Sequence, residues 1–148
     1  MRIVLQRVKE ASVTVDAKIV GRIGKGLLVF LAVAKDDTLD DINYLVKKSI
    51  ELRIFEDTQG KMNCSIAEAD GEFLVVSQFT LLGDCVKGRR PSFDKASDPK
   101  KGEEFYNAFV DALKAANQKV QTGQFRAMMD VALVNDGPVT FILESMNV

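Results

Sequence analysis

The chain has 148 residues, of which 47% are hydrophobic and 28% charged, with a net charge of −1 and no histidine. This length and composition predict one globular domain over residues 1–148 that folds without a disulfide or a structural metal. The small net charge argues against non-specific binding of duplex nucleic acid over the whole surface, and the missing histidine removes the usual general base near neutral pH.

Several features of the sequence favour a cytoplasmic protein that needs no cofactor. Cys64 and Cys85 are the only cysteines, they are not in a CxxC spacing, and nothing at the amino terminus reads as a signal peptide. The longest apolar run, Leu27–Ala34, is too short to span a bilayer. Two scattered cysteines without histidine cannot assemble an ordinary zinc site, and the glycines form neither a GxGxxG nor a Walker loop.

The first half of the chain predicts strands followed by one helix. The stretches Arg2–Val8 and Ala11–Val15 are rich in β-branched residues and read as a first hairpin. A turn marked by Gly21, Gly24 and Gly26 then leads into the buried strand Leu27–Ala34.

After this strand the spacing of apolar residues changes. From Thr38 they recur at intervals of three and four, which predicts an amphipathic helix that ends near Leu52. In the second half, Glu72–Leu82 predicts a central strand that delivers a polar segment at its far end. A second helix is expected to begin after Asp98, which can cap it, with Pro99 in the first turn.

The last third returns to the alternation of a strand. Period two over Phe125–Val134 predicts a strand, Asn135–Pro138 a turn, and Val139–Leu143 a closing strand. Many strands with two main helices, and more hairpins than βαβ crossovers, predict an α+β fold.

A basic stretch lies between the central strand and the second helix. It contains six basic residues against two acidic ones: Lys87, Arg89, Arg90, Lys95, Lys100 and Lys101 against Asp94 and Asp98. A solvated loop is one interpretation, and contact with nucleic-acid phosphates is the other. Phe93 within this stretch can stack on a base, although a core position is the more ordinary fate of an aromatic residue.

Two short motifs carry the chemistry: Ser77-Gln78-Phe79-Thr80-Leu81 and Asn135-Asp136-Gly137-Pro138-Val139-Thr140. Their hydroxyl and backbone groups can bind a developing oxyanion and an amine without an acid-base side chain. They resemble the D-aminoacyl-tRNA deacylase family, also called D-tyrosyl-tRNA deacylase, whose signatures are SQFTL and NxGPxT. Other stretches, from Gln6-Arg7-Val8 to Thr122-Gly123-Gln124-Phe125, follow in the family's order, so the resemblance spans essentially the whole chain.

The resemblance implies an esterase that releases D-amino acids from the aminoacylated 3′ end of tRNA, a chiral proofreading activity that extends to mischarged glycyl-tRNA. It also implies a layered β-β-α sandwich of mostly antiparallel sheets, and a homodimer with its active sites at the subunit interface. A non-catalytic nucleic-acid-binding protein, using the basic stretch, is the alternative, and an amidase of small D-substrates is a third possibility.

In proteins that resemble this one, the turn Ser77-Gln78-Phe79-Thr80 lines the pocket, and the resemblance makes all four residues candidate catalytic residues. The amides of Phe79 and Thr80 are then the expected oxyanion donors. Thr80 as a nucleophile would need a base, and this chain has no histidine to supply one. The resemblance implies the other mechanism, in which the ribose 2′-hydroxyl assists the attack of water and Thr80 positions substrate or water, and we favour it. The alternative to a catalytic role is that this motif is simply the polar end of a buried strand.

The second motif looks like the Gly-cisPro element of the family. The resemblance implies that the Gly137 carbonyl accepts from the substrate ammonium while the backbone of Gly137 and Pro138 fills the space of an L side chain. Arg7 matches the position that braces this turn, and Asn135 and Thr140 frame it. The alternatives are a plain turn, an exposed charge on an edge strand for Arg7, and local backbone hydrogen bonding for the other two.

Overall fold

A six-stranded sheet is built around one long strand in the computed structural model, which describes residues 1–145. The strands of this sheet are β1 (Arg2–Val15), β2 (Lys18–Ile23), β3 (Gly26–Ala32), β6 (Glu72–Ser77), β7 (Val120–Thr122) and β8 (Asp130–Glu144). Their order is β2-β1-β3-β6-β7, and β8 also pairs with β1. A separate hairpin consists of β4 (Phe55–Glu56) and β5 (Met62–Cys64). Four of the six strand pairings are antiparallel, and β6 runs parallel to both of its neighbours.

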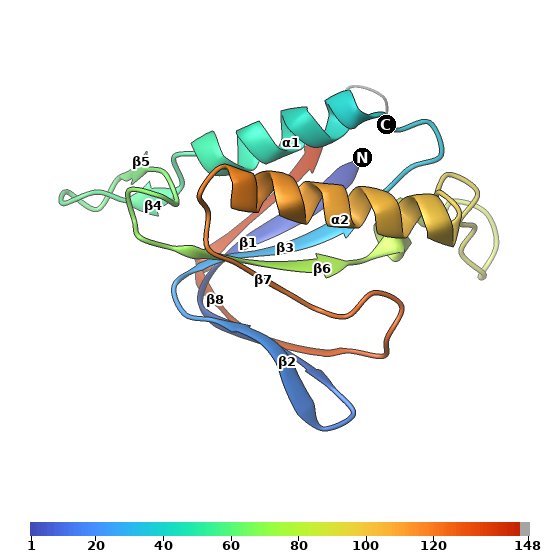
Figure 1. Ribbon diagram of the computed structural model, residues 1–148, viewed down its shortest axis with the longest axis horizontal. Helices are drawn as coiled ribbons and strands as arrows, with labels where there is room; N and C mark the ends of the chain where they lie inside the picture. The colour runs from blue at the N-terminus through green and yellow to red at the C-terminus, as the bar shows by residue number, and fades with distance from the viewer. Residues whose placement is uncertain (146–148) are drawn as a thin grey trace.

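Two helices, α1 (Leu39–Glu51) and α2 (Pro99–Ala115), cover one face of this sheet (Figure 1). The backbone N–H of Thr38 donates to the Asp41 carboxylate at the start of α1, and Asp98 accepts from the Lys101 N–H at the start of α2. The spacing of apolar residues predicted the first helix, and Asp98 and Pro99 marked the start of the second; the structure confirms both helices. No helix in residues 1–145 is both long and apolar enough to cross a membrane.

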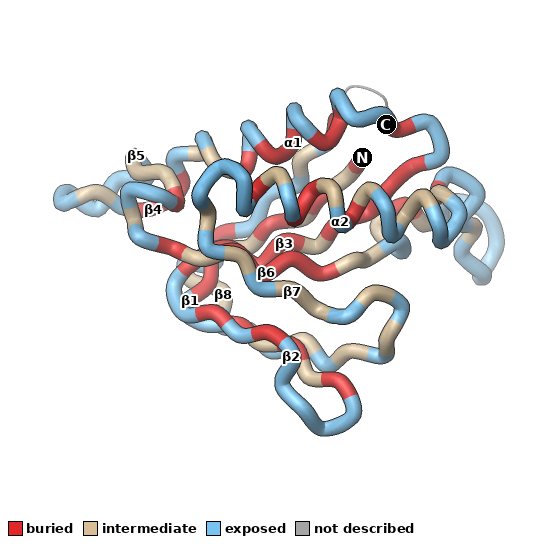
Figure 2. Tube along the Cα trace, viewed as in Figure 1, coloured by how far each residue is buried: buried red, intermediate tan, exposed pale blue. Residues whose placement is uncertain are grey.

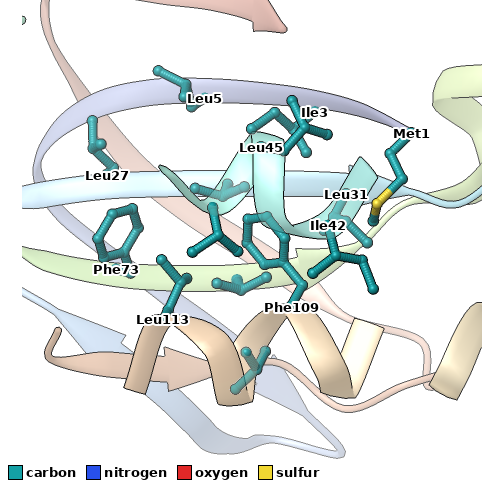
Figure 3. Close-up of a cluster of buried hydrophobic side chains, with 14 of the residues drawn as sticks. Met1, Ile3, Leu5, Leu27, Leu31, Ile42, Leu45, Phe73, Phe109 and Leu113 are labelled. Carbon is teal, nitrogen blue, oxygen red and sulfur yellow. The ribbon is translucent and has the colours of Figure 1, made fainter. Parts of the chain in front are cut away.

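The apolar core lies in two layers, on opposite sides of the sheet. Between the sheet and the helices, Phe109 and Leu113 of α2 and Leu45 of α1 meet Ile3 and Phe73 of the strands (Figure 3). A second cluster fills the space where β1 and β8 fold back over the sheet: Val8, Ala11, Val13, Val15, Ile23, Leu28, Leu74 and Val76. Figure 2 shows the buried residues running along β1, β3 and β6 between these layers. The fold is therefore α+β, as predicted.

The predicted first hairpin was wrong, because Arg2–Val8 and Ala11–Val15 belong to one unbroken strand, β1. The hairpin is instead formed by β1 and β2. The pairing of β1 with β8 shifts register twice between Gln6 and Glu10, so the strand bends without ending. Gly21 lies inside β2, where a Cβ would come within 2.3 Å of the Thr122 carbonyl oxygen, so it permits close packing rather than a turn.

The strand predicted over Phe125–Val134 begins five residues late, because β8 starts at Asp130. Residues 125–129 instead form an irregular segment whose Ala127 and Met129 pack on the second core cluster. β8 then runs through Asn135–Pro138 to Glu144, so the predicted turn does not separate two strands. It is a local turn within β8, where the pairing with β1 shifts register, and we call it the Gly137 turn. The side-chain alternation was real, but it reflects packing against the core rather than a pairing partner.

Candidate active site

A cavity of about 680 Å³ opens at the carboxyl end of β6. It lies between the ends of β3 and β6, the start of α2 and the segment before β8. Ser77, Gln78 and Phe79 line it together with Phe93 and Phe125. A pocket at the ends of parallel strands is where loops can present polar groups on a rigid support. Three residues of the first motif therefore line one hollow, with Thr80 next along the chain.

The first motif leaves β6 through a short 3₁₀ helix, η1 (Phe79–Leu82). The Gln78 N–H donates to the Leu31 carbonyl at 2.8 Å, which ties the motif to β3. The first N–H groups of a helix lack partners within that helix, and this applies to Phe79 and Thr80. Both residues are exposed. Their backbone N–H groups can therefore donate hydrogen bonds to an oxygen of a ligand.

Thr80 has a neighbour that donates to it rather than one that removes its proton. The Gln78 side-chain amide donates a hydrogen bond to the Thr80 hydroxyl oxygen. An amide nitrogen is a donor only and cannot act as a general base. The Thr80 hydrogen is thus directed away from Gln78, so this hydroxyl is set up as a hydrogen-bond donor.

Arg2 holds the far end of η1. Its Nη1 donates to the Leu81 carbonyl at 2.7 Å, and its Nε donates to the Glu144 carboxylate at 2.6 Å. The guanidinium fork can serve two acceptors at once, so it links η1 to β8. The sequence pattern gave no signal for this role, because an arginine at the start of a strand is an ordinary exposed residue.

Tyr106 of α2 packs against Phe125, one of the residues that line the cavity. Its hydroxyl donates to the Val75 carbonyl at 2.8 Å, and its ring lies 5.9 Å from the ring of Phe125. Burial raises the pKa of Tyr106 to about 12, partly offset by a hydrogen bond with the Thr122 side chain. Sequence reasoning missed this residue, which looked like one more aromatic on the buried face of a helix.

The second motif lies on β8, opposite Arg7 of β1. The Gly137–Pro138 peptide bond is cis. Arg7 Nε donates to the Asp136 carbonyl at 3.2 Å, and Nη1 donates to the Ile54 carbonyl at 2.7 Å. Arg7 is only 4% exposed, and β1 has neighbours on both sides, so the alternative of an exposed charge on an edge strand was wrong. Arg7 connects the turn on β8 to the chain entering β4.

Asn135 and Thr140 close this turn with side-chain hydrogen bonds. Asn135 Nδ2 donates to Thr140 Oγ1 at 3.0 Å, and the Val139 N–H donates to Asn135 Oδ1 at 3.0 Å. Both residues therefore hold the local backbone. Gly137 and Pro138 themselves remain exposed, with the backbone of Gly137 at φ +132°, a conformation that L side chains rarely adopt.

The two motifs do not meet within one chain. Arg2 touches η1 and Arg7 touches the Gly137 turn, and both lie on β1. The Cα atoms of these two arginines are roughly 16 Å apart, for five residues at about 3.3 Å each. No residue of the second motif is among those that line the cavity. A single chain therefore presents the cavity and the turn as two separate exposed features.

Phe93 corrects a further expectation. It is 37% exposed rather than a core residue, and its ring meets Phe79 edge-on with centroids 5.0 Å apart.

Within residues 1–145, no group of three His, Cys, Asp or Glu side chains is placed to hold a metal ion.

Comparison with known proteins gives consistent matches along almost the whole chain. A family model described as D-Tyr-tRNA(Tyr) deacylase matches residues 4–144. The D-aminoacyl-tRNA deacylase of Thermosipho africanus (strain TCF52B) is 56% identical over 148 residues, covering 100% of this chain and 99% of that protein. The D-aminoacyl-tRNA deacylase of Desulfatibacillum aliphaticivorans is 59% identical over 145 residues, covering 98% of this chain and 99% of that protein.

Solved structures show the same fold. A c-Myc DNA Unwinding Element Binding Protein superposes with a TM-score of 0.92 at 40% identity, covering 98% of this chain and 99% of that one. A chain described as a probable eukaryotic D-amino acid tRNA deacylase gives a TM-score of 0.86 at 21% identity, covering 97% of this chain and 98% of that one. At 21% identity, the second likeness speaks for the fold alone.

The raised pKa of Tyr106 predicts a specific loss of stability at high pH. The unfolded chain loses this proton near the ordinary value of 10.0, whereas the folded chain keeps it until about pH 12. The stabilisation from the neutral hydroxyl is thus complete below pH 10 and lost as the pH rises through 12, by roughly 2–3 kcal/mol. Urea unfolding at pH 9 to 12 should show this extra loss for the wild type and not for Tyr106→Phe. Tyr44→Phe, which removes an exposed hydroxyl, is the matched control, and identical curves for all three proteins would contradict the assignment.

Proposed function

The chain belongs to the D-Tyr-tRNA(Tyr) deacylase family, and we infer that it hydrolyses the ester bond of D-aminoacyl-tRNA, releasing a D-amino acid and free tRNA. The observation that carries this function is the family match over residues 4–144, which includes both motifs. The enzyme is a carboxylic ester hydrolase. Its substrate is a tRNA, and a cytoplasmic location is part of the proposal because charged tRNA is used there.

The oxyanion is bound by backbone amides. Ester hydrolysis builds negative charge on the former carbonyl oxygen, and fixed N–H donors lower the energy of that state. The amides of Phe79 and Thr80 fit this role because they open η1 beside the cavity. Ser77 and Gln78 hold the entry to the turn, and Gln78 is anchored on β3. These groups need no cofactor.

Thr80 positions the attacking group rather than attacking itself. Gln78 donates to its hydroxyl oxygen, and the chain has no histidine to accept its proton. Water is therefore the nucleophile, with the 2′-hydroxyl of the terminal ribose assisting it. The Thr80 hydroxyl then donates a hydrogen bond that holds the substrate or the water in place.

Chirality is selected by the Gly137 turn of a second subunit. Within one chain no residue of the turn is among those that line the cavity, so the proposed site is complete only if another copy supplies the turn. The Gly137 carbonyl accepts from the substrate ammonium, while the adjacent backbone excludes an L side chain. Such a filter ignores the identity of a D side chain and does not reject glycine, which adds glycyl-tRNA to the proposed substrates.

A homodimer is supported by apolar side chains that β8 leaves in solvent. Val134 is 45% exposed, Phe141 37% and Ile142 65%, and all three lie on the strand that carries the turn. Exposed apolar residues that cluster on one element are typical of a protein interface. Two-fold pairing would bring two copies of the turn to two cavities.

The alternative of a nucleic-acid-binding protein without catalysis is less well supported. One structural relative is named for DNA binding, but the curated relatives that cover almost the whole chain are named as deacylases. Binding through the basic stretch and ester hydrolysis are also compatible, because the substrate is itself an RNA.

The function predicts a large preference for D-esters. Incubation with matched D- and L-tyrosyl-tRNA should release D-tyrosine at least about 100-fold faster than L-tyrosine, a difference of about 2.7 kcal/mol in barrier height. The released amino acid is quantified against the spontaneous rate without enzyme. Equal rates for both hands would refute chiral selection, and no acceleration of either would refute the deacylase function.

The role of Thr80 can be tested by removing its hydroxyl. If it only positions the substrate or water, Thr80→Ala should lose less than about tenfold in kcat/KM, the value of one ordinary hydrogen bond. Thr58→Ala, on the exposed β4–β5 hairpin, is the control for loss of a threonine hydroxyl. A loss of about 10⁴-fold, or a trapped acyl-enzyme, would instead identify Thr80 as the nucleophile.

The shared site predicts that activity depends on assembly. Ile142→Asp places a charge on the exposed face of β8 and should give monomers by sedimentation, with kcat/KM for D-tyrosyl-tRNA reduced at least about 100-fold. Ile19→Asp makes the same change at a 51% exposed position on β2 and should leave the dimer intact. A fully active monomer would show that the partner's turn is not required.

A further inference from the structure

The segment between η1 and α2 forms a loop with a closed base, which we call the basic loop (residues 84–95). Asp84 and Ser92 exchange two backbone hydrogen bonds, of 2.7 and 2.9 Å. The Asp84 carboxylate also accepts from the Val86 N–H at 2.8 Å. These bonds fix the base of the loop and therefore restrict where its apex can lie relative to the cavity.

The apex carries three cations that pair with no carboxylate of residues 1–145. Lys87, Arg89 and Arg90 are exposed, and none of them forms an ion pair with any carboxylate in residues 1–145. The Asp84 carboxylate, at the base, is occupied by a backbone N–H. In a chain of net charge −1, such an unpaired group of positive charges indicates an anionic partner.

Several basic residues elsewhere in the fold have partners within the chain. Arg2 and Arg7 hold backbone carbonyls, while Lys47 and Lys119 pair with the carboxylates of Glu51 and Asp70. Their charges serve the fold or are locally balanced. The apex of the basic loop differs from these sites because three cations within four residues have no carboxylate partner in residues 1–145.

The basic loop is joined directly to the cavity. Phe93, at its base, packs edge-on against Phe79, with ring centroids 5.0 Å apart, and both rings line the cavity. Arg90 is three residues from Phe93, so their Cα atoms are at most about 10 Å apart. In Figure 1 the basic loop projects beyond the carboxyl end of β6, beside the start of α2.

We propose that the basic loop binds the phosphodiester backbone of the substrate RNA next to its esterified ribose, through Arg89 and Arg90 with Lys87 beside them. The proposal rests on the deacylase function argued above and adds a second contact to it. Guanidinium groups bind phosphate oxygens in bidentate fashion, and such contacts position an RNA without reading its sequence. The Phe79–Phe93 contact fixes the distance between the phosphate-binding arginines of the basic loop and the backbone amides that bind the oxyanion. The basic loop thus selects for an ester attached to a polynucleotide over the same ester on a free nucleoside.

The test compares two substrates that carry the same D-tyrosyl ester. One is D-tyrosyl-tRNA, and the other is adenosine esterified on its ribose with D-tyrosine, which contains no phosphate. The double variant Arg89→Ala/Arg90→Ala should lose at least about tenfold in kcat/KM with the tRNA, mainly through KM, and this loss should exceed any loss with the nucleoside at least tenfold. Between 50 and 200 mM salt, the slope of log(kcat/KM) against log[salt] should become shallower by about 1.4 for two lost contacts to single-stranded RNA.

Lys18→Ala/Lys114→Ala removes two exposed charges away from the cavity and is the matched control, expected to follow the wild type with both substrates. Wild-type tRNA kinetics and salt slope in the arginine variant would overturn the proposal, as would equal losses with both substrates. Failure of the wild type to cleave either D-ester would instead refute the deacylase function, so the two failures can be told apart. Thermal unfolding of each variant shows whether a loss reflects misfolding.

Discussion

The bend in β1 is the constraint on which the rest of the structure depends. The first part of the strand sends Ile3 and Leu5 into the core beneath the helices, and the second part sends Val8 and Val13 into the other cluster. Both parts keep antiparallel partners, because β8 follows β1 with compensating register shifts. One strand therefore belongs to both layers, and its length sets the spacing between everything attached to its ends.

Arg7 lies at this bend, and its guanidinium holds the Gly137 turn of β8 in place. Its guanidinium is almost fully buried, and its bonds to the carbonyls of Asp136 and Ile54 satisfy backbone groups from two different elements. A buried cation is costly unless it is fully hydrogen-bonded, so this position tolerates little change. At the other end of β1, Arg2 holds η1 in a comparable way. The two candidate halves of the active site thus rest on two arginines of one strand.

Local signals in the sequence were enough to predict both helices and the first motif at the end of β6. Asp98 and Pro99 mark the start of α2, and the apolar run before Ser77 marks a buried strand. The continuity of β1 was not predictable, because Lys9 and Glu10 are exposed at the bend and interrupt the apolar pattern as a turn would. The roles of Arg2 and Tyr106 were missed for a related reason: their partners come from elements distant in sequence. The distance between the motifs depends on strand pairing, which no local pattern contains.

The unpartnered N–H groups at the start of η1 have a consequence for how such an enzyme can evolve. Every amino acid except proline supplies the same peptide donor, so side chains around the proposed oxyanion site can drift while the reactive groups stay in place. Harmful mutations would then act by moving the main chain, and would concentrate at supporting positions such as Arg2 or Tyr106. The catalytic geometry would then be preserved wherever the main-chain fold is preserved, even as the surrounding side chains change.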